Sequence, residues 1–176
     1  MKTIENKDYI FFLSLMTAFA LSLYFFEVLI PQPLPFMKVG LSNIVVLVLI
    51  LSFFTKEAFI VALSKSVIGS FFTGTLISPS FVLSISGACF SCFIMVIAYR
   101  FLKNFSVFGL SVLGAFAHLL AQLVMVRLIL IKTNSIFTLY PLIVFSAIIT
   151  GLITGMLAFV FMKHINLRSV YVKISN

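Results

Sequence analysis

The chain has 176 residues, of which 62% are hydrophobic and only 9% are charged. So few polar side chains cannot coat a water-soluble globule of this size, and the composition therefore predicts an integral membrane protein embedded in the lipid bilayer. We interpret the net charge of +8 as a membrane-topology signal, and we expect no nucleic-acid binding.

Six apolar runs follow one another along the chain, and we predict a transmembrane helix for each. They fall at about 10–30, 40–54, 57–74, 81–99, 107–131 and 138–162. The second and third runs are short against the roughly 20 residues of a spanning helix, so we expect a tight hairpin about Thr55, Lys56 and Glu57. The sequence thus predicts an all-α polytopic membrane protein, a single six-helix domain over residues 1–176 with no room for a soluble catalytic domain.

Basic residues divide unevenly between the two predicted sides of the membrane. Most lie on the side of the N-terminus: Lys2, Lys7, Lys56, Arg100, Lys103, Lys163, Arg168 and Lys173. Lys38 and Lys132 lie opposite. Because cytoplasmic loops carry the excess of Lys and Arg, we predict a multi-pass protein of the cell membrane with both termini in the cytoplasm. The first apolar run continues well past Ala18-Phe19-Ala20, which favours a transmembrane helix over a cleaved signal peptide.

Cys89 and Cys92 stand one helical turn apart inside the fourth run. A structural zinc site needs about four ligands, and the chain offers no other cysteine and only His118 and His164 as further candidates. Thiols among apolar residues are more often packing residues. We therefore expect structural thiols, no metal and no cofactor.

Small residues recur at helix-packing spacing in two of the runs. Ser14, Ala18 and Ser22 lie on one stripe of the first, and Gly151 and Gly155 form Gly-x-x-x-Gly in the sixth. Such stripes let helix backbones approach closely. We predict that the glycines pack inside the bundle, whereas the first stripe either packs internally or faces another membrane subunit.

Polar side chains within the apolar runs are the main candidates for function. Lys65 lies near the middle of the third run, and His118 and Gln122 share one face of the fifth at i and i+4. Further polar groups lie toward the outer ends: Glu27, Lys38, Asn43 and Arg127. Ionisable groups inside a membrane usually mark a ligand or ion path. Because cations outnumber acids here, the pattern favours a small ligand that is anionic or has an anionic part.

Structural roles stay open for several of these residues. Lys38 and Arg127 either bind the ligand or extend to the outer headgroups. Glu27 either contacts the ligand or pairs with Lys65, which would make the site neutral. His118 and Gln122 either contact the ligand or bridge helices.

Four short segments, in this order, carry a resemblance to a known family. They are KVGLSNIV at 38–45, ISPSF at 77–81 followed by Ser86-Gly87, GAFAH at 114–118 and AQL at 121–123. The chain resembles the Gx transporter family, also named heptaprenyl diphosphate synthase component I, over about residues 10–162. That family is similar to the substrate-binding S components of energy-coupling factor (ECF) vitamin transporters.

The resemblance implies a six-helix bundle like an ECF S component, with a ligand site that faces outward. Uptake would then need a membrane coupling subunit and two ATPase subunits, since this chain has no Gly-x-x-x-x-Gly-Lys-[Ser/Thr] phosphate loop. In S components a small-residue stripe on the first helix meets the coupling subunit. Ser14, Ala18 and Ser22 match its spacing, with serines where alanines are more typical.

The family's second name proposes a different role. Chain-elongating prenyl synthases resemble one another through Asp-rich motifs that bind magnesium diphosphate, but the only aspartate in this chain is Asp8. We therefore do not expect an enzyme. The alternative is a non-catalytic membrane component linked to prenyl diphosphate or quinone synthesis, or to membrane electron transfer. The residues suit a small amphiphile: a vitamin, a cofactor precursor or a prenyl phosphate.

Overall fold

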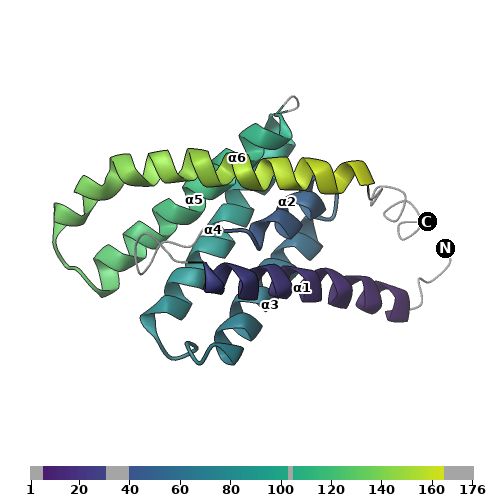
Figure 1. Ribbon diagram of the computed structural model, residues 1–176, viewed down its shortest axis with the longest axis horizontal. Coiled ribbons are helices and arrows are strands. Elements are labelled where there is room, and N and C mark those ends of the chain that lie inside the picture. The colour runs from purple at the N-terminus through teal and green to yellow at the C-terminus, as the bar shows by residue number, and fades with distance from the viewer. Residues whose placement is uncertain (1–5, 31–39, 103–104, 165–176) are drawn as a thin grey trace.

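The computed structural model describes residues 6–30, 40–102 and 105–164, and no strand occurs among them. The described chain forms six α-helices and one 3₁₀-helix (Figure 1). They are α1 (Asn6–Leu29), α2 (Asn43–Leu51), α3 (Thr55–Phe72), α4 (Pro79–Phe101), α5 (Val107–Ile129), η1 (Asn134–Leu139) and α6 (Tyr140–His164). The all-α prediction is confirmed.

Four segments are long and apolar enough to cross a membrane: Tyr9–Leu29, Pro79–Phe101, Val107–Ile129 and Ser135–His164. These helices indicate a membrane protein. The prediction of six spans is not confirmed, because α2 has nine residues, or about 14 Å, against a hydrocarbon core of about 30 Å. The third run forms the 18-residue α3, which carries three charged residues, Lys56, Glu57 and Lys65.

The hairpin between α2 and α3 lies earlier in the chain than predicted. Phe53 has a positive φ of 73°, and the amide of Phe54 donates to the carbonyl of Leu49, the hydrogen bond that closes a Schellman helix end. The turn therefore occupies residues 52–54, and Thr55 already begins α3. Glu57 lies in the first turn of α3, where the helix dipole favours an acid.

The helices alternate in direction. At one end of the bundle, the Tyr9 hydroxyl at the start of α1 donates to Glu57 at the start of α3 over 3.1 Å. The Tyr99 hydroxyl at the end of α4 donates to the carbonyl of Leu51 at the end of α2 over 3.4 Å. The start of α1 and the end of α6 lie on the same side of the molecule (Figure 1). Successive helices thus run to and fro between two ends.

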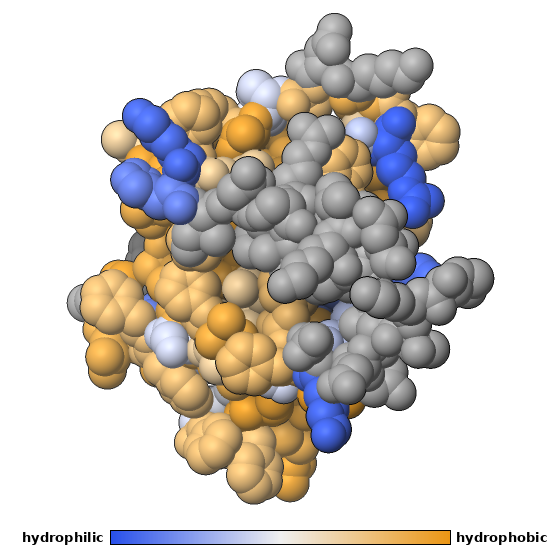
Figure 2. Space-filling model, turned by 90° about the vertical axis from the view of Figure 1, so that its right-hand side faces the viewer, coloured by the Kyte–Doolittle hydropathy of each residue, from blue (hydrophilic) through white to orange (hydrophobic). Residues whose placement is uncertain are grey.

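The end with the starts of α1, α3 and α5 is the basic one. The exposed Lys7 and Lys56 lie at the starts of α1 and α3, and the exposed Arg100 and Lys163 lie at the ends of α4 and α6. At the opposite end, Arg127 lies in the last turn of α5 and Lys132 follows it. Figure 2 shows the molecule from the side where α1 begins and α6 ends. Hydrophilic residues are scattered there over a mostly hydrophobic surface. The asymmetry of basic residues therefore coincides with one end of the bundle.

The short helix α2 lies at the centre of the bundle and contacts α1, α3, α4, α5 and α6. Every residue from Ile44 to Ile50 is buried, as expected for a helix that is apolar all round. Its neighbour α1 presents a buried stripe: Phe12, Met16, Ala20, Tyr24 and Glu27. The central position of α2 brings its first turn into the polar interior of the bundle.

The glycines of α6 pack against α5, as the sequence predicts. A Cβ on Gly151 would lie 2.5 Å from the Cα of Val112, and one on Gly155 would lie 3.1 Å from the Cβ of Ser111. The first distance is shorter than real Cβ contacts, so α5 and α6 can approach this closely only because residue 151 has no side chain.

Candidate functional site

The candidate site is built around Lys65, which projects from the middle of α3 and is 3% exposed. Its ammonium Nζ donates to the hydroxyl of Ser42 over 2.8 Å and to the Oδ1 of Asn43 over 2.5 Å. Ser42 is the N-cap residue of α2, but its hydroxyl does not cap that helix. The first turn of the central helix therefore supplies acceptors to a buried cation.

Glu27 of α1 joins the same network and is 2% exposed. Its carboxylate accepts from the backbone N–H of Gly40 and, over 3.5 Å, from the hydroxyl of Ser42. Gly40 has a φ of +81°, a conformation that L side chains rarely adopt. Ser42 thus links the carboxylate of Glu27 to the ammonium of Lys65, and the two formal charges balance within one network.

His118 lies on α5 and is 7% exposed. Its ring packs flat against α4 at Gly87, where a Cβ would come within 2.8 Å of the imidazole Cε1. A side chain at position 87 would therefore displace the ring. The close approach explains why a glycine of α4 and a histidine of α5 occupy facing positions.

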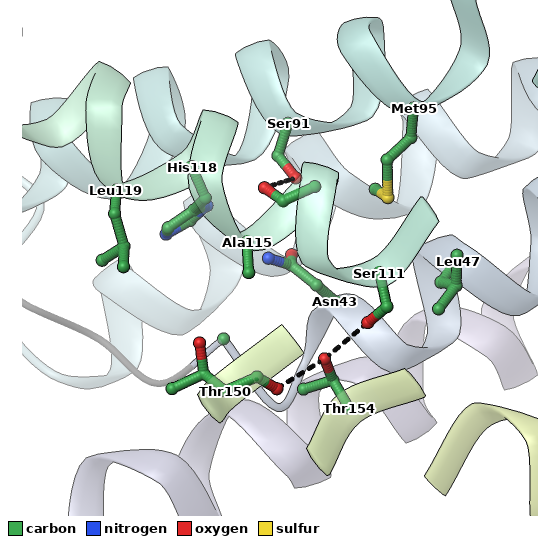
Figure 3. Close-up of a pocket in the computed structure, with 12 residues that line it drawn as sticks. Asn43, Leu47, Ser91, Met95, Ser111, Ala115, His118, Leu119, Thr150 and Thr154 are labelled. Carbon is green, nitrogen blue, oxygen red and sulfur yellow. Dashed lines mark hydrogen bonds between the residues drawn. The ribbon is translucent and has the colours of Figure 1, made fainter. Parts of the chain in front are cut away.

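Two small polar cavities flank His118. The first has a volume of about 20 Å³, and Figure 3 draws its lining. Its polar lining residues are Asn43, Ser91, Ser111, His118, Thr150 and Thr154. The hydroxyls of Ser111 and Thr154 lie 2.8 Å apart, and the Ser91 hydroxyl donates to the carbonyl of Gly114 over 2.8 Å. Hydrogen bonds thus join α4, α5 and α6 around this cavity.

The second cavity lies on the side of Lys65 and has a volume of about 10 Å³. It shares Gly40 and His118 with the first cavity. Its other polar lining residues are Tyr24, Glu27, Ser42, Lys65, Ser66 and Ser84. Each cavity has space for about one water molecule. A molecule the size of a vitamin can enter only if the elements around Lys65 and His118 move apart.

The structure brings together four of the predicted site residues: Glu27, Asn43, Lys65 and His118. Gln122, one turn farther along α5, lines neither of these cavities. It is 2% exposed, and its amide has no hydrogen-bond partner within the described part of the chain.

Two predicted cations lie elsewhere. Arg127 lies in the last turn of α5 and lines neither cavity. Lys38 lies outside the described residues.

Several residues of the site were not singled out from the sequence: Tyr24, Ser42, Ser66, Ser84, Ser91, Ser111, Thr150 and Thr154. Ser42 lies inside the KVGLSNIV segment, beside Asn43. Thr150 and Thr154 directly precede Gly151 and Gly155. That glycine face was predicted to be internal, so its threonines could have been predicted to point inward as well.

The structure also places the two cysteines and the stripe of small residues on α1. Cys92 is buried, Cys89 is half-buried, and both are free thiols. No group of three or more His, Cys, Asp or Glu side chains in the described ranges is placed to hold a metal ion. Ser14, Ala18 and Ser22 are all exposed, so the stripe does not pack inside the described bundle.

Comparison with known proteins gives one result. A sequence model of the family described as heptaprenyl diphosphate synthase component I matches residues 16–161. No curated protein and no solved structure matches the chain. The family match confirms the resemblance under the second of its two names, while the likeness to ECF S components stays a prediction. Because the match covers nearly all of the helical bundle, the chain belongs to the heptaprenyl diphosphate synthase component I family.

Proposed function

We propose that this protein is the substrate-binding membrane subunit, or S component, of an ECF-type uptake transporter. Its ligand would be a small vitamin or cofactor precursor with a polar, charged part. The observation that carries the proposal is the buried network of Lys65, Glu27, Ser42 and Asn43 beside His118. Ionisable groups buried inside a membrane protein are costly and usually serve a ligand or ion path.

The exposed face of α1 supports the second half of the proposal, which is docking to a coupling subunit. Ser14, Ala18 and Ser22 are exposed, and the Ser22 hydroxyl donates back to the carbonyl of Ala18 over 3.0 Å. This internal hydrogen bond satisfies the polar hydrogen of Ser22 within its own helix. The small side chains of this stripe would let the backbone of another helix approach closely. Two ATPase subunits would act through that coupling subunit.

The family description favours a second candidate, since it names a component of a prenyl diphosphate synthase. Under this proposal the chain is a non-catalytic membrane component linked to prenyl diphosphate or quinone synthesis, or to membrane electron transfer. A non-catalytic role is consistent with the name "component I" and with a chain whose only aspartate is Asp8. The polar network would then serve a prenyl phosphate or a quinone head group.

Purification from native membranes distinguishes the two candidates. We expect the tagged protein, solubilised in mild detergent, to retain a membrane coupling subunit and two ATPase subunits, which mass spectrometry of the eluate would identify. Retention of a soluble prenyl synthase subunit in their place would contradict the transporter proposal and favour the second candidate. A tagged membrane protein of similar size and unrelated sequence controls for nonspecific retention.

We further propose that the basic end of the bundle faces the cytoplasm of a cell membrane, with both termini on that side. The proposal rests on the exposed Lys7, Lys56, Arg100 and Lys163 at that end. In a variant without native cysteines, Ser135→Cys should react with an impermeant maleimide in intact cells. Lys56→Cys should react only after permeabilisation. Equal labelling of both in intact cells would contradict the topology.

A further inference from the structure

We infer that the ligand of this site presents a hydrogen-bond donor beside an acceptor, as a zwitterion or an amide-like edge does, and is not a simple anion. The inference rests on the proposed substrate-binding function and narrows its ligand class. It starts from the buried charges among the described residues, where one carboxylate and one ammonium, Glu27 and Lys65, share Ser42 as a partner.

The turn at residues 40–43 shows which kinds of hydrogen-bonding group Glu27 and Lys65 bind. It offers Glu27 two donors, the N–H of Gly40 and the hydroxyl of Ser42. It offers Lys65 two acceptors, the hydroxyl of Ser42 and the Oδ1 of Asn43. The turn therefore presents donors and acceptors side by side, on a segment only four residues long.

The cavities beside the turn are too small for a ligand to bind unless the surrounding elements move. At about 20 and 10 Å³, each has space for about one water molecule. A larger molecule reaches Lys65 and Glu27 only if the elements around them move apart, and its polar groups then compete with those of the turn. Where it displaces them, it must replace their hydrogen bonds, because a buried charge that loses its partners is strongly destabilised.

A simple anion meets only half of that requirement. It could accept from Lys65, but it would bring a second negative charge next to the buried carboxylate of Glu27, and like charges repel strongly where water is excluded. A prenyl diphosphate would bring still more negative charge. A ligand with an adjacent donor and acceptor satisfies both buried groups, as the turn does now.

The test uses the full chain in detergent and the water-soluble metabolite extract of bacterial cells as the probe. After incubation and gel filtration, mass spectrometry compares the compounds retained by the natural protein with those retained by the charge-free double variant Lys65→Met/Glu27→Gln. We expect an enrichment of at least about tenfold for a compound that carries an N–H donor beside an acceptor. The loss of one charge-assisted hydrogen bond corresponds to a factor of this size.

The single variant Glu27→Gln gives an independent test by the sign of its effect. We expect it to retain the enriched compound less well by about tenfold, whereas a site for simple anions would retain its anion better once the carboxylate is gone. If Glu27→Gln does not fold, the chemical class of the compounds retained by the natural protein decides between the two ligand classes. Enrichment of a phosphate, a diphosphate or a simple carboxylate would overturn the inferred ligand class alone. Enrichment of nothing would contradict the proposed binding function itself, and the inference with it.

Discussion

Replacing Lys65 with methionine is expected to lower the stability of the protein in detergent sharply. The substitution leaves the Glu27 carboxylate 2% exposed without the ammonium to which Ser42 links it. Leaving a buried charge without its compensating charge typically costs about 3–5 kcal/mol. The melting temperature of purified Lys65→Met, followed by intrinsic tyrosine fluorescence, checks this expectation.

The double variant Lys65→Met/Glu27→Gln separates the structural role of Lys65 from its role in binding. Removing both charges should restore most of the melting temperature, because no uncompensated buried charge remains. Binding should not return, and retention of metabolites should stay at least about tenfold below that of the natural protein. Lys56→Met, at the exposed start of α3, serves as the matched control and should change neither property.

Two outcomes would contradict this combined role. If the double variant regained both stability and binding, Lys65 and Glu27 would form a structural pair only. If Lys65→Met were as stable as the natural protein and retained metabolites equally well, Lys65 would not belong to the site. The sequence left the roles of these two residues open. The structure links the two residues, because Ser42 contacts both of them, and the role in binding is our proposal.

The fold could be predicted from the sequence as far as hydropathy determines it. The apolar runs correctly locate six helices, since side chains that avoid water favour a segment whose backbone hydrogen bonds are internal. Hydropathy does not show where a backbone turns. The second run remains apolar through Phe53 and Phe54, yet α2 ends at Leu51 because Phe53 adopts a left-handed conformation. The run therefore predicts a longer helix than the structure contains.

The candidate site could be predicted in part, for a similar reason. Lys65, Glu27 and His118 stand out because ionisable groups are rare in apolar runs. Ser42 and Thr154 do not stand out, because serine and threonine are common in the apolar segments of membrane proteins. The link from Glu27 to Lys65 depends on how α1, α2 and α3 pack, and no local pattern in the sequence encodes that arrangement.

Replacing Ala18 with tryptophan is expected to abolish binding to the proposed coupling subunit while leaving the isolated protein intact. Ala18 lies on the face of α1 opposite its buried stripe and is exposed, so the larger side chain meets no part of the described bundle. Small residues at a helix interface let two backbones approach closely, and an indole ring would hold them apart. Retention of the coupling subunit in a pull-down should therefore fall at least about tenfold, a loss of about 1.4 kcal/mol or more.

The control for this prediction is Met156→Trp, which places the same indole on an exposed position of α6. It should leave retention of the coupling subunit unchanged, because the proposed docking face is confined to α1. For both variants the melting temperature and the metabolites retained should match those of the natural protein, since Lys65 and Glu27 lie in the interior. If Ala18→Trp also lost metabolite binding or stability, the stripe would support the bundle itself and the docking proposal would fail. A normal pull-down with Ala18→Trp would mean that the coupling subunit docks on another face.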